Sequence, residues 1–153
     1  MKIREIMTSD PRVCSPGTNL AVAAELTLDG DCGILPVVDD GKLVGVVTDR
    51  DLYIALATRN KLASEITVGD VVQAPVWTCE PDDDVQDALG TMKRHLVRRL
   101  PVEGFGRTVH GIISMNDILL AAGPRQPALE AEVVEALQTI CAHHEPVLHV
   151  VAA

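Results

Sequence analysis

The chain has 153 residues and a formal net charge of −9, from 13 Lys and Arg against 22 Asp and Glu. That length fits one domain or two small ones. Hydrophobic residues make up 47% and aromatic residues only 2%, so the core must be built from aliphatic side chains. Nucleic acid is disfavoured as a partner, because its phosphates require a basic surface and here the acid excess is spread along the whole chain.

The cysteines are widely spaced and form no C-x-x-C pair, which argues against a zinc knuckle or a disulfide scaffold. No apolar run approaches the roughly 20 residues that a membrane helix needs. The first ten residues alternate charge with Ile and Met, unlike a secretory leader. We therefore expect a soluble, cytoplasmic protein with reduced thiols and no membrane partner; the cysteines are Cys14, Cys32, Cys79 and Cys141.

An internal repeat organises the chain. Ile3 aligns with Val68 and Gly45 with Gly111, so the two copies are offset by 65 to 66 residues. Each copy alone is too small for a comfortable core, and we expect the two to pack against each other. The first copy takes residues 1–65, the second takes 66–123, and a C-terminal helix and tail take 124–153.

The predicted elements of the first copy follow from its hydrophobic pattern and its turn residues. Thr18 or Asn19 caps a helix that runs through LAVAAELTL to Gly30. The Asp39–Lys42 turn, DDGK, is typical of a hairpin. In chain order we expect an extended stretch at 12–14, that helix, strands at 34–38 and 43–48, and a second helix at 49–58.

The second copy repeats this order, so each copy is a β-α-β-β-α unit and the fold class is mixed α/β (α+β). Beyond it, Pro127 can open a further helix with one apolar face. That face predicts docking within the chain or a dimer contact. The elements expected in the second copy are a strand at 76–78, a helix from the 82–84 cap to 95, strands at 99–102 and 109–114, and a helix at 116–122.

One motif carries a chemical hypothesis: GVVTDRD at 45–51 and GIISMND at 111–117. Each places a hydroxyl and a carboxylate three residues apart where a strand leads into a helix. The hydroxyl lies beside helix N-terminal amides, which attract an anion, and the carboxylate can accept hydrogen bonds from a vicinal diol. Phosphate and ribose fit this pair. The alternative is that these residues only cap their helices.

The two copies resemble the cystathionine β-synthase (CBS) domain, through I-M-T or its relative, an x-L-P-V strand and G-h-x-T/S-x-x-D at the end of each copy. Over roughly residues 1–122 the chain is similar to a tandem pair, called a Bateman module. The resemblance implies pseudo-twofold symmetry, sheets that face each other, and clefts that bind adenosine-containing ligands such as AMP, ADP, ATP, NADH or S-adenosylmethionine. It also implies a homodimer, with the ligand regulatory and no cofactor required.

Carried over residue by residue, the resemblance implies ribose contacts for Asp51 and Asp117. It implies phosphate contacts for Thr48 and Ser114. Arg50 lies inside the first motif where the second has Asn116, which makes the first copy the better phosphate site. The remaining expected contacts are Ile34 and Arg99 on the adenine or phosphate side, and Thr8 and Val13 framing the first cleft.

The second copy departs from the pattern in two respects. It has VVQ, ending at Gln73, where the first has IMT. It also carries a basic cluster, formed by Lys93, Arg94, His95, Arg98 and Arg99. Lys93 and Arg94 are expected to form salt bridges to Asp83, Asp84 or Asp87. Strand alternation predicts that only one of Arg98 and Arg99 points to a cleft. Tyr53 and Trp77 are expected to be packing residues, although Trp77 could border the second cleft.

No catalytic arrangement is found, because no Ser or Cys lies in a recognisable nucleophile context. The interpretation is a non-enzymatic regulatory module whose occupancy is signalled to an unidentified protein in trans. The main alternative is a ligand-free dimer that acts as a protein-interaction module. A metal-binding stress protein ranks last, because the tail residues that could serve as ligands are poorly spaced for zinc: Cys141, His143, His144 and His149.

Overall fold

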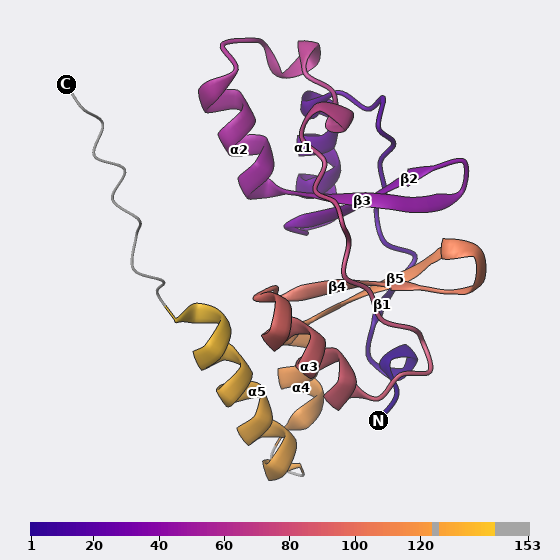
Figure 1. Ribbon diagram of the computed structural model, residues 1–153, viewed down its shortest axis with the longest axis vertical. Helices are drawn as coiled ribbons and strands as arrows, with labels where there is room; N and C mark the ends of the chain where they lie inside the picture. Colours follow the sequence, from indigo (N-terminus) through magenta and orange to yellow (C-terminus); the bar gives the residue numbers. More distant parts are fainter. Residues whose placement is uncertain (124–125, 143–153) are drawn as a thin grey trace, which may run out of the picture.

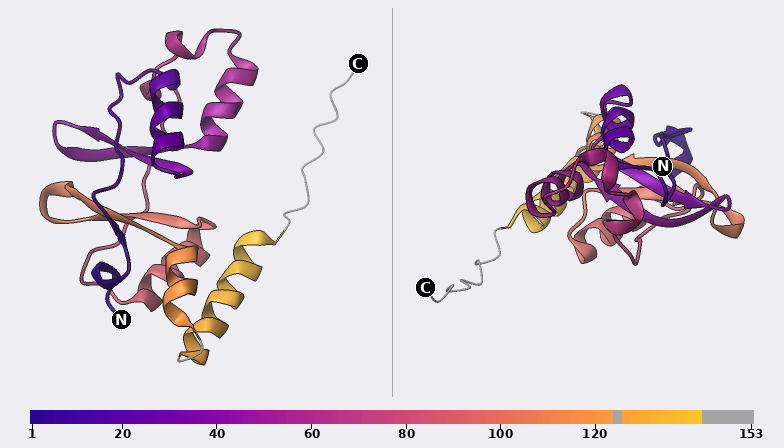
Figure 2. Two further views of the ribbon diagram at one scale, coloured as in Figure 1. Left: turned by 180° about the vertical axis from the view of Figure 1, so that it is seen from behind. Right: turned by 90° about the horizontal axis from the view of Figure 1, so that it is seen from above.

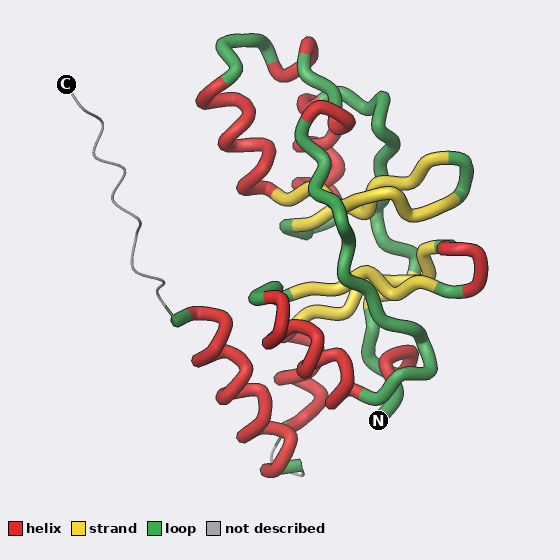
Figure 3. Tube along the Cα trace, viewed as in Figure 1, coloured by secondary structure: helices red, strands yellow, loops and turns green. Residues whose placement is uncertain are grey.

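The computed structural model describes residues 1–123 and 126–142, which form two small sheets that face each other, each with helices on its outer side (Figure 1). One sheet pairs β2 with β3 and the other has the order β1-β5-β4, all antiparallel. Figure 3 shows the same layering, with the strands at the centre and the helices outside. The expected mixed fold of two similar units is confirmed. The first copy contributes α1 (Leu20–Asp29), β2 (Ile34–Asp39), β3 (Lys42–Thr48) and α2 (Asp49–Thr58); the second contributes α3 (Val85–His95), β4 (Arg99–Glu103), β5 (Val109–Ser114) and α4 (Met115–Ala122); β1 (Thr8–Ser9) precedes them and α5 (Pro127–Cys141) follows.

Local sequence signals place these elements. Asn19 caps α1, because its Oδ1 accepts a hydrogen bond from the Val22 amide at 3.0 Å. The hairpin between β2 and β3 turns at Asp40 and Gly41, both with positive φ, as an Asp-Gly turn requires. The extended stretch expected at 12–14 contributes one parallel bridge, between Cys14 and Val37. The strand expected at 76–78 does not form, and the equivalent parallel bridge is made one residue later, between Cys79 and Val102.

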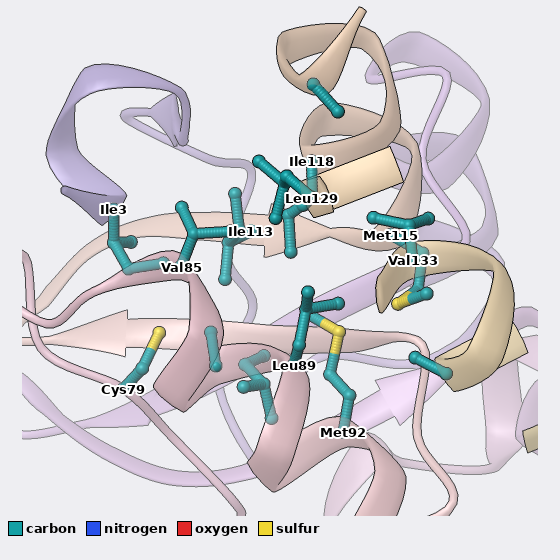
Figure 4. Packing of buried hydrophobic residues seen from close by; sticks show 14 of the residues in the cluster. Ile3, Cys79, Val85, Leu89, Met92, Ile113, Met115, Ile118, Leu129 and Val133 are labelled. Atoms are coloured by element: carbon teal, nitrogen blue, oxygen red, sulfur yellow. The ribbon is translucent and has the colours of Figure 1, made fainter. Parts of the chain in front are cut away.

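The N-terminal segment packs into the second copy, not the first. Ile3 is fully buried in the core formed by α3, β4, β5, α4 and α5, and its amide donates to the Asp83 carbonyl at 3.1 Å. β1 then pairs with β5, with Thr8 opposite Ile112. Figure 4 shows Ile3 beside Val85 and Ile113 in this core.

The segment between the copies packs in the reciprocal way, into the first copy. We call this segment and the N-terminal segment the two crossing segments. Ile66 and Val68 are buried in the core of the first copy, and Gln73 pairs with Val46 on β3 through two backbone hydrogen bonds. Figures 1 and 2 show both crossing segments running between the two layers. The ranges 1–65 and 66–123 therefore describe the repeat in sequence, whereas each packed half contains the segment that precedes the other copy.

Two glycines of the repeated motif make room for the crossings. A Cβ on Gly111 would lie 2.7 Å from the Thr8 carbonyl oxygen and 2.8 Å from the Met7 sulfur. A Cβ on Gly45 would overlap the Val72 side chain. These glycines are needed because another backbone approaches the strand at that position.

The helix α5 docks on the second copy. Leu129, Val133 and Ala136 are buried against α3 and α4, and Figure 4 shows the first two beside Ile118 and Met115. Docking within the chain is thus confirmed for this helix. Within the described residues, no helix is both long and apolar enough to cross a membrane.

The predicted salt bridges of the basic cluster are wrong. Lys93 pairs with Glu135 on α5, at 2.6 Å, because it lies in the last turn of α3, remote from the acidic residues at the helix start. Arg94 makes no ion pair in the described part of the chain. The N-terminal segment supplies the ion-pair partners of the acidic residues instead: Arg4 pairs with Asp82, and Lys2 and the terminal amine pair with Asp84.

The crossing geometry predicts opposite effects for two Gly→Ala substitutions. Gly111→Ala should lower the free energy of unfolding by about 1–3 kcal/mol, because the new methyl group meets the crossing backbone. Gly90→Ala, in an open position of α3, should raise it by roughly 0.5–1 kcal/mol through helix propensity. Urea unfolding measures both; equal effects of the two substitutions would contradict the close approach.

The buried cysteines give a pH prediction. Burial raises the pKa of Cys14 to about 11 and that of Cys79 to about 12, so both stay protonated at pH 8 and alkylate slowly. Cys141, which is exposed, and Cys32, which is half-buried, should react with iodoacetamide first. Because the pKa values of Cys14 and Cys79 in the folded chain lie above the usual thiol value, these two buried thiols should lower the free energy of unfolding as pH rises from about 9 towards 12. Mass spectrometry of native protein at pH 8 measures the order in which the thiols are labelled. Equally fast labelling of all four thiols would contradict the predicted order.

Candidate functional site

Two clefts open between the copies. Cleft A has a volume of about 400 Å³ and is lined by the first motif together with Trp77, Arg98 and Arg99 from the second copy. Cleft B has a volume of about 270 Å³ and is lined by the second motif together with Thr8, Arg12 and Cys32. Ile34 and Arg99 line both clefts.

In cleft A the motif forms a reciprocal helix cap. The Thr48 amide and hydroxyl both donate to Asp51 Oδ2, at 2.9 and 2.7 Å, and the Asp51 amide donates back to Thr48 Oγ1 at 3.2 Å. The other carboxylate oxygen, Oδ1, accepts a hydrogen bond from Gln73 Nε2 at 3.0 Å. The capping interpretation of the motif is therefore confirmed, and both side chains also face the cleft.

Cleft B repeats the cap with one difference. The Ser114 amide and hydroxyl donate to Asp117 Oδ2 at 2.8 and 2.6 Å, and the Asp117 amide returns a hydrogen bond to Ser114 Oγ at 3.3 Å. Among residues 1–123 and 126–142, no side chain or backbone amide donates to Asp117 Oδ1. One carboxylate oxygen of this cleft is thus open to a ligand.

Positive charge gathers at cleft A. Arg50, Arg98 and Arg99 all line it, and none of them forms an ion pair within the described part of the chain. Both Arg98 and Arg99 reach the cleft, contrary to the expectation from strand alternation, because β4 begins only at Arg99. Asp49 and Asp51 share the same walls, so the cleft offers guanidinium groups next to carboxylates.

The two aromatic residues expected to pack, Tyr53 and Trp77, do not behave alike. Trp77 lies on the wall of cleft A and stacks on His95, with ring centroids 3.5 Å apart and planes 10° apart. It belongs to the cleft of the first motif and not to that of the second. Tyr53 is 72% exposed, so its expected packing role is wrong; Leu52 and Ala55, its neighbours on α2, face the core instead.

Other predicted site residues divide between the clefts. Asn116 lines cleft B. Thr8 also lies in cleft B and not with Thr48, because β1 pairs with β5. Val13 is 42% exposed and lines neither cleft. The sequence gives no signal for Arg12 and Cys32, because both lie outside the repeated motifs. They line cleft B only because the two sheets face each other.

No group of three or more His, Cys, Asp or Glu side chains in the described ranges could hold a metal ion. Cys141 is exposed at the end of α5. The proposed tail ligands His143, His144 and His149 lie outside the described residues.

Comparison with known proteins agrees with this architecture. A family model described as "CBS domain" matches residues 3–58 and 68–123. The uncharacterised protein YlbB of Bacillus subtilis is 36% identical over 122 residues, which cover 78% of this chain and 81% of that protein.

Solved CBS structures share the fold. The CBS domain pair of protein MJ0100, in complex with 5′-methylthioadenosine and S-adenosyl-L-methionine, superposes with a TM-score of 0.74 at 27% identity, covering 82% of this chain and 98% of that one. CBSX2 in complex with AMP gives 0.67 at 27% identity, covering 79% and 95%. Hypoxic Response Protein I with two coordinated zinc ions gives 0.71 at 28% identity, covering 78% and 98%. The repeat, the facing sheets and these matches together show that the chain belongs to the CBS-domain family and carries two CBS domains in tandem.

Proposed function

We propose that this chain is a regulatory module that binds a phosphorylated adenosine ligand, of the class AMP, ADP or ATP, in cleft A. The observation that carries the proposal is the set of three cleft arginines without ion pairs in the described part of a chain with net charge −9. Guanidinium groups bind phosphate by paired, charge-assisted hydrogen bonds.

The rest of cleft A suits the remainder of such a ligand. Its volume of about 400 Å³ falls in the usual range for small-molecule sites. Asp51 presents a carboxylate to sugar hydroxyls, and the amides at the start of α2 favour a nearby anion. Ile34, Val46 and Trp77 provide apolar surface for a base. The AMP complex of CBSX2 and the S-adenosyl-L-methionine complex of the MJ0100 pair support an adenosine ligand for this fold. NADH carries phosphate and so belongs to the proposed class, whereas S-adenosylmethionine shares only its adenosine part and is the alternative adenosine ligand.

The proposed mode of action is regulatory and not catalytic. Cleft A has walls from both copies, so a ligand there contacts both at once. It can shift an equilibrium between arrangements only by binding one of them more tightly. We place this module in the cytoplasm, with its occupancy signalled to a protein target in trans.

The alternative is a protein-interaction module, and one observation favours it. The outer face of the first copy exposes apolar side chains on α1 and α2, whereas α5 covers part of the second copy's helices. We propose that a second copy of this chain covers the exposed face, giving a homodimer. Its exposed residues are Val22, Leu28, Tyr53, Ile54 and Leu56.

Ligand binding is tested by isothermal titration of AMP and adenosine. AMP should bind with a dissociation constant in roughly the micromolar range, more tightly than adenosine. Arg98→Ala or Arg99→Ala should weaken AMP by about tenfold each and leave adenosine nearly unchanged, because each removes a charged hydrogen bond to phosphate. Arg94→Ala, an exposed arginine of α3 outside the cleft, is the matched control.

Asp51→Ala and Asp117→Ala identify the working cleft in the same titration. A larger loss of AMP affinity with Asp51→Ala than with Asp117→Ala would support cleft A as the tighter site, and the weaker binding left in Asp51→Ala protein reports on cleft B. If AMP, ADP, ATP, NADH and S-adenosylmethionine all fail to bind well-folded protein, the ligand proposal is wrong and the interaction module takes its place.

The dimer is tested by light scattering after gel filtration. Wild type should elute with twice the chain mass of 16.4 kDa, and the double substitution Tyr53→Glu and Leu56→Glu should shift it to monomer by placing two charges in the apolar face. Phe105→Glu, at a fully exposed loop position, should leave the dimer intact. A monomeric wild type would contradict the proposal.

A further inference from the structure

The two clefts differ in how many hydrogen bonds their carboxylates still accept. A carboxylate has about four acceptor positions, two on each oxygen. In Asp117 the helix cap takes both positions of Oδ2, and Oδ1 receives no donor from the described residues. In Asp51 the cap takes the same two positions, and Gln73 Nε2 takes one of Oδ1. Asp117 therefore keeps two open positions and Asp51 keeps one.

The backbone fixes Gln73 at this place. Its amide donates to the Val46 carbonyl at 2.9 Å and its carbonyl accepts from the Val46 amide at 3.3 Å, so the crossing segment pairs with β3 two residues before Thr48. The residue at the matching point of the other crossing is Thr8, paired with Ile112 two residues before Ser114. Threonine is shorter, and within the described chain its side chain makes no hydrogen bond to Asp117. One residue thus accounts for the difference between the carboxylates.

We propose that Gln73 determines the sugar specificity of cleft A. A vicinal diol has two hydroxyl donors: the carboxylate of cleft B can accept both, whereas that of cleft A accepts one while Gln73 stays bonded. Cleft A accordingly discriminates weakly against adenosine ligands that lack one ribose hydroxyl, and cleft B discriminates strongly. This inference rests on the proposed binding of an adenosine ligand.

The experiment compares AMP with 2′-deoxy-AMP and 3′-deoxy-AMP by isothermal titration. Asp117→Ala protein reports on cleft A and Asp51→Ala protein on cleft B, each checked for folding by circular dichroism. In cleft A the loss of one hydroxyl should change the dissociation constant by less than about threefold. In cleft B it should weaken binding by about tenfold, the value of one hydrogen bond to a charged group.

Substitution of Gln73 should then change the selectivity of cleft A. In the Asp117→Ala background, Gln73→Ala and Gln73→Thr should tighten AMP and raise the penalty for a missing hydroxyl to about tenfold, because Asp51 Oδ1 regains its second acceptor position. Gln86→Ala, an exposed glutamine of α3 outside both clefts, should change neither value.

The outcomes separate the two proposals. AMP binding with an unchanged ratio of AMP to deoxy-AMP affinity in the Gln73 variants would overturn the role of Gln73 and leave the proposed function standing. No AMP binding to wild-type protein would overturn both. A penalty that rises only in the Gln73 variants supports the inference.

Discussion

The architecture depends on the two crossing segments, the N-terminal one and the one between the copies. Each copy lacks one part of its core, and the segment preceding the other copy supplies it: Ile3 for the second, Ile66 and Val68 for the first. Burying such aliphatic side chains is the main favourable term in folding. Neither half can therefore separate from the other without exposing its own core, and the two sheets are held face to face.

That arrangement creates the clefts and determines their composition. Each cleft combines the motif of one copy with side chains from the other, so neither is complete in a single repeat. The same crossing segments that close the cores bring Gln73 to Asp51 and Thr8 into cleft B. A cleft bounded by both copies suits the proposed regulation, since a ligand there would contact both copies at once.

The sequence predicts the local structure well, but it does not predict that each crossing segment packs into the core of the other half. The Asn19 cap, the Asp-Gly hairpin and the β-α-β-β-α order follow from short-range signals that the structure reproduces. Periodicity cannot say into which core a segment packs, because Ile3 and Val68 have the same apolar character wherever they lie. For the same reason the sequence places Thr8 in the first cleft, whereas it lies in cleft B, and gives no signal for Glu135 on α5 as the partner of Lys93. The Thr48–Asp51 and Ser114–Asp117 pairs and Arg50 are visible within the motifs, and Arg99 follows from the family resemblance. That Arg98 also reaches cleft A, and that Trp77 lies in this cleft, depends on tertiary placement.

The most direct test of the account is an NMR titration of isotope-labelled protein with AMP. If the ligand lies between the two copies, amide signals along the walls of cleft A should shift with AMP concentration, at Thr48, Asp51 and Trp77 in particular, and those of the exposed α1 and α2 surface should stay unchanged. Shifts confined to that helical surface, or none at millimolar AMP, would contradict a ligand site between the two copies.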